Sequence, residues 1–140
     1  KYFKMHLQNI EYIIGTEISP SATQFEDTIQ HDFHEARKDW LGYFDVVYTN
    51  SWDHSYDYKK SLNTWIDSLA VGGYLFIEWS ENNMIDAGHE IDPFRASYDD
   101  YEEIFSNREK IEVEGTAVVE SAQSDGFKFS KKHYFILRKI

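Results

Sequence analysis

The 140-residue sequence has no cysteine and only two prolines, and its 14 basic residues are outnumbered by 25 acidic ones. Without cysteine it can form no disulfide, thiolate zinc site or thiol nucleophile, which fits a cytoplasmic protein. The formal net charge of −11 would repel nucleic-acid phosphates, so we expect no nucleic-acid partner. No apolar run reaches the roughly 18 residues of a membrane-spanning helix, so we expect no membrane partner.

Apolar residues are plentiful enough for a folded core. The sequence is 41% hydrophobic and 17% aromatic, and its length suits one domain spanning residues 1–140. The chain starts at Lys1 rather than at a methionine, so we expect it to be a fragment of a longer protein. Any targeting signal is therefore undetermined.

The stretch Phe44–Asn50 organises the rest of the chain. Its apolar run Val46–Tyr48 predicts a strand buried on both faces, in the middle of an α/β sheet. Polar residues follow at once, where open α/β sheets bind ligands beyond the carboxyl ends of their strands. These residues are Asn50, Ser51, Asp53 and His54.

Two shorter strands with an acid at the tip are predicted upstream. Tyr12–Ile14 predicts a strand that runs on to Glu17, and Ser19-Pro20 then predicts the start of a short helix. Thr28–His31 predicts the second strand, which ends at Asp32. Before both, residues 1–9 suit the end of a helix.

Downstream of the central strand, helices alternate with strands. Apolar residues at helical spacing predict a helix from Tyr58 to Leu69, stopped by Gly72-Gly73. Tyr74–Trp79 predicts a strand parallel to the central one, because crossovers are right-handed. The remaining predictions are a lid or binding loop over Ser80–Ala96, a helix capped by Ser97, and an antiparallel pair formed by Ile111–Val119 and His133–Ile140.

In this order the elements resemble the second through seventh strands of a class I S-adenosylmethionine-dependent methyltransferase. The helix-Gly-Gly-strand passage ending in Gly72-Gly73-Tyr74-Leu75 is the most specific single piece. The resemblance implies a Rossmann-like α/β fold, mostly parallel with a C-terminal antiparallel strand pair. It also implies S-adenosylmethionine as the cofactor and a small molecule as the substrate.

The resemblance assigns cofactor-binding roles to individual residues. Glu17 matches the acid that accepts hydrogen bonds from the ribose hydroxyls, and Asp32 matches the side chain that accepts from the adenine amino group. Both are expected to be exposed strand-tip carboxylates. The other matches are Ile18 against the adenine, Phe33 with a neighbouring backbone amide, and Asn50 and Ser51 on the wall near the methyl donor.

One part of the family pattern is absent. The first strand and its glycine-rich turn should precede Lys1, and nothing in Lys1–Ile14 has G-x-G spacing. In the family that strand lies between Tyr12–Glu17 and Phe44–Asn50, so we expect the sheet to rearrange or another chain to fill the gap. A homodimer is the expected result, because an open apolar edge is a template for a second copy.

The residues after the central strand permit more than one interpretation. Asp53 and His54 suit a general base and the acid that orients it, but Asp53 could instead cap the next helix while His54 makes local contacts. Trp52 is a candidate substrate platform. A metal site at His31, Asp32, His34, Asp53 and His54 is a weaker alternative, since His31 and His34 would point to opposite faces of one strand.

The favoured hypothesis is methyl transfer to a small polar metabolite or a sugar-like acceptor. The tetrapeptide typical of amine methylation, an Asn or Asp followed by two prolines and an aromatic residue, is absent at Asn50–Asp53. This disfavours N-methylation of bases or amides and leaves oxygen, carbon or other acceptors open. The alternative is a non-catalytic methyltransferase-like module or fragment that acts through self-association.

Overall fold

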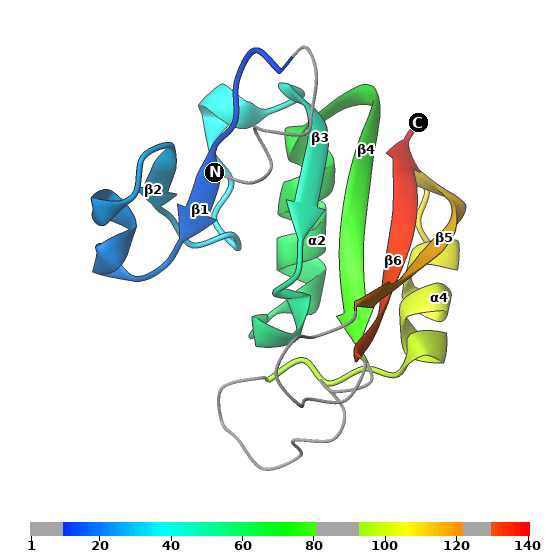
Figure 1. The fold of residues 1–140 in the computed structure, drawn as a ribbon. Coiled ribbons are helices and arrows are strands. Elements are labelled where there is room, and N and C mark those ends of the chain that lie inside the picture. The colour runs from blue at the N-terminus through cyan, green and yellow to red at the C-terminus, as the bar shows by residue number, and fades with distance from the viewer. Residues whose placement is uncertain (1–9, 81–92, 122–129) are drawn as a thin grey trace. The chain divides into compact units, whose positions relative to one another are not determined.

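The computed structural model describes residues 10–80, 93–121 and 130–140 (Figure 1). The helix end predicted at residues 1–9, most of the predicted lid and the turn near Gly126 lie outside these ranges. The chain divides into two compact units, Lys1–Glu35 and Ala36–Ile140, which we call the N-terminal and C-terminal units. The expectation of a single domain stays a prediction.

The N-terminal unit contains a small parallel sheet. Strand β1 (Gly15–Glu17) pairs with β2 (Thr28–Gln30), and a 3₁₀ helix, Pro20–Gln24, connects them. The predicted helix start is confirmed, because the Ser19 side chain accepts a hydrogen bond from the Ser21 amide with proline in the first turn. The strand predicted from Tyr12 to Glu17 is confirmed for Gly15–Glu17 only; pairing begins at Gly15, and Tyr12 is 58% exposed.

The C-terminal unit is built on a four-stranded sheet. Its helices are the 3₁₀ turns Lys38–Trp40 and Trp52–His54 and the α-helices α2 (Tyr58–Ser68) and α4 (Tyr98–Ser106). Its strands are β3 (Phe44–Thr49), β4 (Leu69–Ser80), β5 (Ile111–Ser121) and β6 (Ser130–Lys139). The strand order is β3-β4-β6-β5. The β3–β4 pair is parallel and the other pairs of this sheet are antiparallel, which confirms the predicted parallel pairing and the terminal antiparallel pair.

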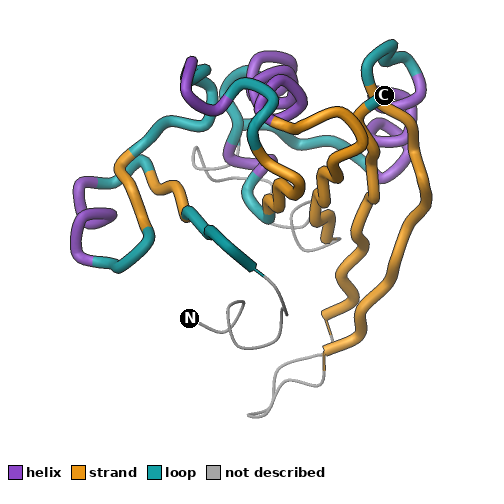
Figure 2. Tube along the Cα trace, turned by 90° about the horizontal axis from the view of Figure 1, so that it is seen from above, coloured by secondary structure: helices purple, strands orange, loops and turns teal. Residues whose placement is uncertain are grey.

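Both α-helices lie on one side of this sheet (Figure 2). Asp57 caps α2, and Ser97 with Asp100 forms a capping box at the start of α4, as the sequence predicts for Ser97. The helices bury Leu62, Trp65, Ile66, Tyr101 and Phe105. Alternate strand residues are buried with them, namely Leu75, Ile77 and Trp79 of β4 and Phe135 and Leu137 of β6.

The sequence predicts that the glycine pair Gly72-Gly73 stops α2, but this prediction is wrong. The helix ends at Ser68, and both glycines lie inside β4, where the β3–β4 register shifts. Gly72 has a φ of +84°, which favours glycine. A Cβ on Gly73 would lie 3.0 Å from the Asp45 carbonyl oxygen and 2.9 Å from that of Ala70, so only glycine allows this close approach.

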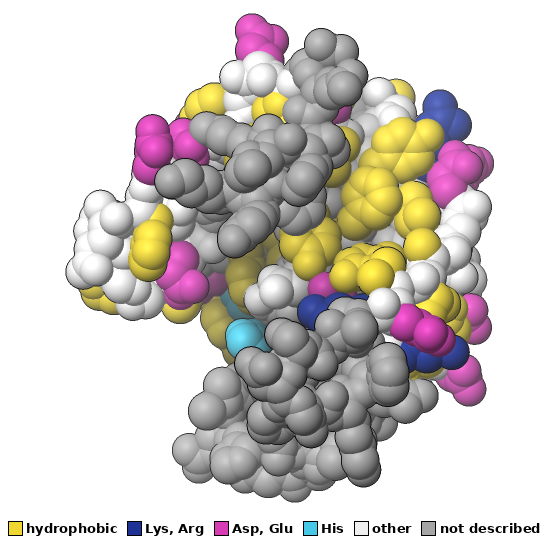
Figure 3. All heavy atoms as spheres, viewed as in Figure 1, with side chains coloured by type: hydrophobic (Ala, Val, Ile, Leu, Met, Phe, Trp, Pro, Cys, Tyr) yellow, Lys and Arg dark blue, Asp and Glu magenta, His cyan; other side chains and the backbone are white. Residues whose placement is uncertain are grey.

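The prediction that β3 is buried on both faces is wrong. Val46 is 53% exposed and Tyr48 is 40% exposed. The reason is that α2 and α4 lie on the same side of the sheet. Val46 and Tyr48 pair with Tyr74 and Phe76 of β4, which alternate with the buried residues that face the helices. Figure 3 shows hydrophobic side chains gathered over the strands on the face opposite α2 and α4. An apolar run therefore marks a strand here without requiring two covered faces.

Candidate functional site

Glu17 is the last residue of β1, and its side chain is exposed as predicted. One carboxylate oxygen, Oε1, accepts a hydrogen bond from the Ser19 amide at 2.9 Å. The next residue, Ile18, is 63% exposed. An accessible carboxylate beside an accessible apolar side chain is chemically suited to the sugar and base of a nucleoside.

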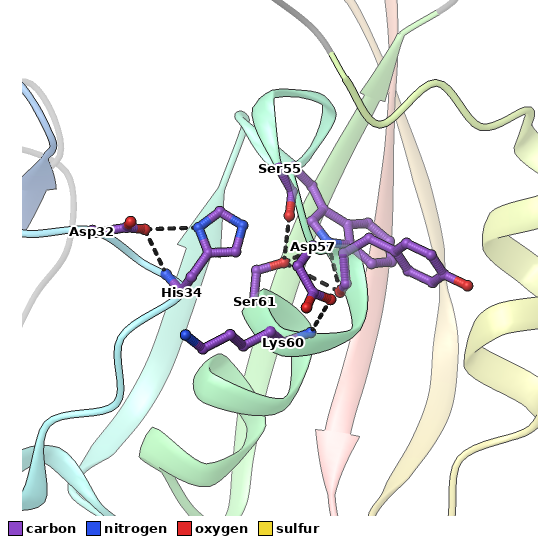
Figure 4. A network of polar contacts seen from close by, with 8 residues as sticks. Asp32, His34, Ser55, Asp57, Lys60 and Ser61 are labelled. Atoms are coloured by element: carbon purple, nitrogen blue, oxygen red, sulfur yellow. Dashed lines mark hydrogen bonds and ion pairs between the residues drawn. The ribbon is translucent and has the colours of Figure 1, made fainter.

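Asp32 follows β2, but its carboxylate is less accessible than predicted. The side chain is 26% exposed, and Oδ1 accepts from both the backbone amide of His34 at 2.9 Å and the ring Nδ1 at 2.7 Å (Figure 4). His34 is only 2% exposed, and its ring centroid lies 4.5 Å from that of Phe33. Asp32 therefore has a structural role in the N-terminal unit whether or not it also contacts a ligand.

In the C-terminal unit, a tight turn follows β3. The Ser51 amide donates to Thr49 Oγ1 at 3.2 Å, and its hydroxyl donates to Asn50 Oδ1 at 3.1 Å. The His54 amide then donates to the Ser51 carbonyl at 3.2 Å. Asn50 and His54 are exposed, so their side chains are accessible to a ligand at the carboxyl end of β3.

Trp52 is not a substrate platform, because its side chain is fully buried. Its indole Nε1 donates to Ser61 Oγ of α2 at 3.1 Å, and Ser61 Oγ lies 3.0 Å from Ser55 Oγ (Figure 4). Its ring packs against those of Tyr58, Trp65, Phe94, Tyr101 and Phe105. Trp52 therefore anchors the turn that carries the predicted site residues to the core of the unit.

Asp53 does not cap the following helix, since Asp57 does so. The Asp53 carbonyl accepts from the Phe94 amide at 2.9 Å. Burial raises the pKa of Tyr101, and the negative charge of Asp53 raises it further. The Asp53 carboxylate therefore interacts electrostatically with a residue of the core. Its predicted role in orienting His54 stays a prediction.

A polar cluster that the sequence did not predict lies on the face of the sheet opposite α2 and α4. Glu78 Oε2 accepts from the hydroxyls of Tyr48 at 2.9 Å and Tyr134 at 3.1 Å, and Lys132 Nζ lies 2.6 Å from Oε1. Burial, together with Glu78, raises the pKa of both tyrosines. A glutamate inside the otherwise apolar run Tyr74–Trp79 was the signal that could have identified this cluster.

Among the described residues, no group of three or more His, Asp or Glu side chains could hold a metal ion. Within the same ranges no helix is long and apolar enough to cross a membrane. A groove of about 770 Å³ lies between α2 and α4, lined by Tyr58, Phe94, Arg95, Ile104 and Arg108 among others, and it includes none of the predicted site residues.

Comparisons with known proteins identify the fold. No protein-family model matches the chain, and no curated protein matches it in sequence. One similar structure comes from work on the conversion of a disulfide bond into a thioacetal group during echinomycin biosynthesis. It has a TM-score of 0.67 and 17% identity, covering 97% of this chain and 70% of that one.

A second similar structure is the N-methyltransferase NodS from Bradyrhizobium japonicum WM9 in complex with S-adenosyl-L-homocysteine. Its TM-score is 0.68 at 14% identity, covering 99% of this chain and 71% of that one. This chain has a methyltransferase fold. The predicted α/β methyltransferase-like fold is therefore confirmed, whereas the missing first strand stays a prediction.

Proposed function

We propose that the protein transfers a methyl group from S-adenosylmethionine to a small polar acceptor. The observation that carries the proposal is the topology: a parallel pair, β3 and β4, is followed by the antiparallel strands β6 and β5. The same fold occurs in NodS, which was solved with the demethylated product of that cofactor. An accessible polar turn follows β3, at the end of the sheet where such folds bind ligands.

The residues of the N-terminal unit suit the nucleoside part of the cofactor. Glu17 would accept hydrogen bonds from the ribose hydroxyls, and exposed Ile18 would pack on the adenine. Asp32 would accept from the adenine amino group, and the backbone amide of Phe33 would donate to the base. The His34 contact holds the Asp32 carboxylate in one orientation, which is a form of preorganisation.

The residues of the C-terminal unit suit the reacting end. Asn50 and Ser51 would line the cofactor site beside the sulfonium. The cofactor would supply the activated methyl group carried by that sulfur. His54 would accept the proton that the acceptor hydroxyl loses as the methyl group passes from the sulfur to the hydroxyl oxygen and S-adenosylhomocysteine is left, and Asp53 would orient or charge the imidazole. The exposure of His54 makes its ring accessible to an acceptor. A hydroxyl of a sugar-like molecule fits this role.

The test is the binding of S-adenosylhomocysteine to the full-length protein by titration calorimetry. We expect Glu17→Ala to weaken binding by about 1–3 kcal/mol, the cost of a lost hydrogen bond to a charged group. Glu26→Ala is the matched control, because Glu26 is an exposed acid of the same unit without a proposed ligand role. The proposal would be contradicted if the unsubstituted protein did not bind S-adenosylhomocysteine, or if the two variants bound it with equal affinity.

A further inference from the structure

The outer edge of β5 is a candidate interaction surface whose role is independent of methyl transfer. β5 is the outermost strand of the four-stranded sheet (Figure 1). It pairs with β6 along its whole length. In the described part of the chain, no strand pairs with its other edge. Backbone donors and acceptors along such an edge can pair with another strand.

The second half of β5 lacks the features that usually protect an edge. A register shift between Val113 and Gly115 interrupts the first half, and that half also carries glutamates 112 and 114. Bulges and charges of this kind discourage pairing. The stretch Thr116–Val119, by contrast, is uncharged and has no proline. Residues 116–119 therefore form an unprotected edge.

Both faces of this stretch expose branched apolar side chains. Val118 and Val119 are each 48% exposed. Because consecutive strand residues point to opposite faces, the two valines would contribute apolar contacts on both sides of a newly formed pair. A docked strand would therefore gain side-chain packing as well as backbone hydrogen bonds.

We propose that a second copy of this chain docks on this edge, with the two β5 strands antiparallel about a two-fold axis at Val118. In that register Ala117 lies opposite Val119, and Thr116 lies opposite Glu120 of the other copy. No two carboxylates are directly opposed in this stretch, although each copy is acidic. The contact is self-complementary, as a two-fold dimer requires. It joins the two four-stranded sheets into one.

The charge of the chain predicts how this dimer responds to salt. Two copies with a net charge of −11 repel each other, and salt screens that repulsion. The dimer should therefore tighten as ionic strength rises. A basic protein bound to the same edge would show the opposite response.

The absence of cysteine allows a direct test by cross-linking. In the full chain, Val118→Cys places two thiols opposite each other across the two-fold axis, within the Cα separation that a disulfide spans. Val113→Cys is the matched control, because Val113 is 47% exposed on the same strand but precedes the register shift. Mild oxidation should yield a covalent dimer of the Val118→Cys variant and little covalent dimer of the Val113→Cys variant. Equal cross-linking would overturn the proposal.

Light scattering over a micromolar concentration series provides the second test. The parent and Val113→Lys should dimerise, whereas Val118→Lys should stay monomeric because two lysines would face each other. A monomeric parent, or dimerisation by all three, would overturn the proposal. If Val118→Lys does not fold, amide hydrogen exchange of the unsubstituted protein provides the test. The amides of residues 116–120 should exchange more slowly at high than at low protein concentration. Exchange rates that do not change with concentration would overturn the proposal.

Discussion

The two parts of the predicted site are held in place by different means. In the N-terminal unit, the candidate carboxylates bond to neighbours two residues along the chain, Glu17 to Ser19 and Asp32 to His34. In the C-terminal unit, the turn that carries Asn50 and His54 is anchored through the buried ring of Trp52. Local bonds orient single side chains, whereas the buried ring positions a whole turn. Substitutions in the two regions should therefore differ in their effects on stability.

The largest expected effect is that of Trp52→Ala. Removing a fully buried indole should lower the free energy of unfolding by about 3–5 kcal/mol, because the lost contacts and the cavity both cost stability. Urea denaturation followed by circular dichroism measures the change. Trp52→Phe, which keeps an aromatic ring but loses the bond to Ser61, should cost less. A loss below about 1 kcal/mol for the alanine variant would show that the turn is anchored elsewhere.

Asp32→Ala should have the next largest effect. It removes the oxygen that accepts both hydrogen bonds from buried His34, at a cost of about 1–3 kcal/mol. Asp32→Asn keeps an acceptor oxygen and should recover part of that stability in the same denaturation experiment. If both variants match the parent, the carboxylate is not a structural element of the N-terminal unit.

Ser61→Ala should cost about 1 kcal/mol, the typical net value of a hydrogen bond. The effect is limited because Trp52 Nε1 also donates to the Tyr58 carbonyl at 3.3 Å, although Ser55 loses this hydroxyl partner. Ser106→Ala, at an exposed position of α4, is the control and should be neutral in thermal unfolding. Equal melting temperatures for the two variants would contradict the proposed anchoring of the turn.

The smallest effect on stability should come from Glu17→Ala. The side chain is exposed and accepts one bond from a nearby amide, so unfolding should change by no more than about 0.5 kcal/mol. The variant thus separates ligand binding from folding. A large loss of stability in chemical denaturation would mean that Glu17 is a structural acid.

Periodicity predicted the C-terminal unit well because its elements are long. The apolar spacing of α2, the Ser97 cap and the apolar run of β4 each depend on neighbours close in sequence. The misassigned glycines show the limit of this reasoning. Whether Gly72-Gly73 ends a helix or allows two strands to approach depends on β3, which lies far from them in the sequence.

The candidate site was predicted less completely, for the same reason. The accessible positions of Glu17, Asn50 and His54 follow from their places at strand ends. The burial of Trp52 depends on aromatic residues from α4 and from the segment before it, which no local pattern around Trp52 reveals. The Asp32–His34 contact and the tyrosine pair on Glu78 likewise required side-chain geometry.

Photo-cross-linking of radiolabelled S-adenosylmethionine to the full-length protein, with peptide mapping, tests the central claim most directly. The account predicts label on peptides containing residues 17–18 or 32–33 of the N-terminal unit and residues 50–54 of the C-terminal unit. Excess unlabelled S-adenosylhomocysteine should prevent this labelling by competing for the site. Label absent from both units, or confined to the groove residues between α2 and α4, would contradict the proposal that these strand ends bind the cofactor.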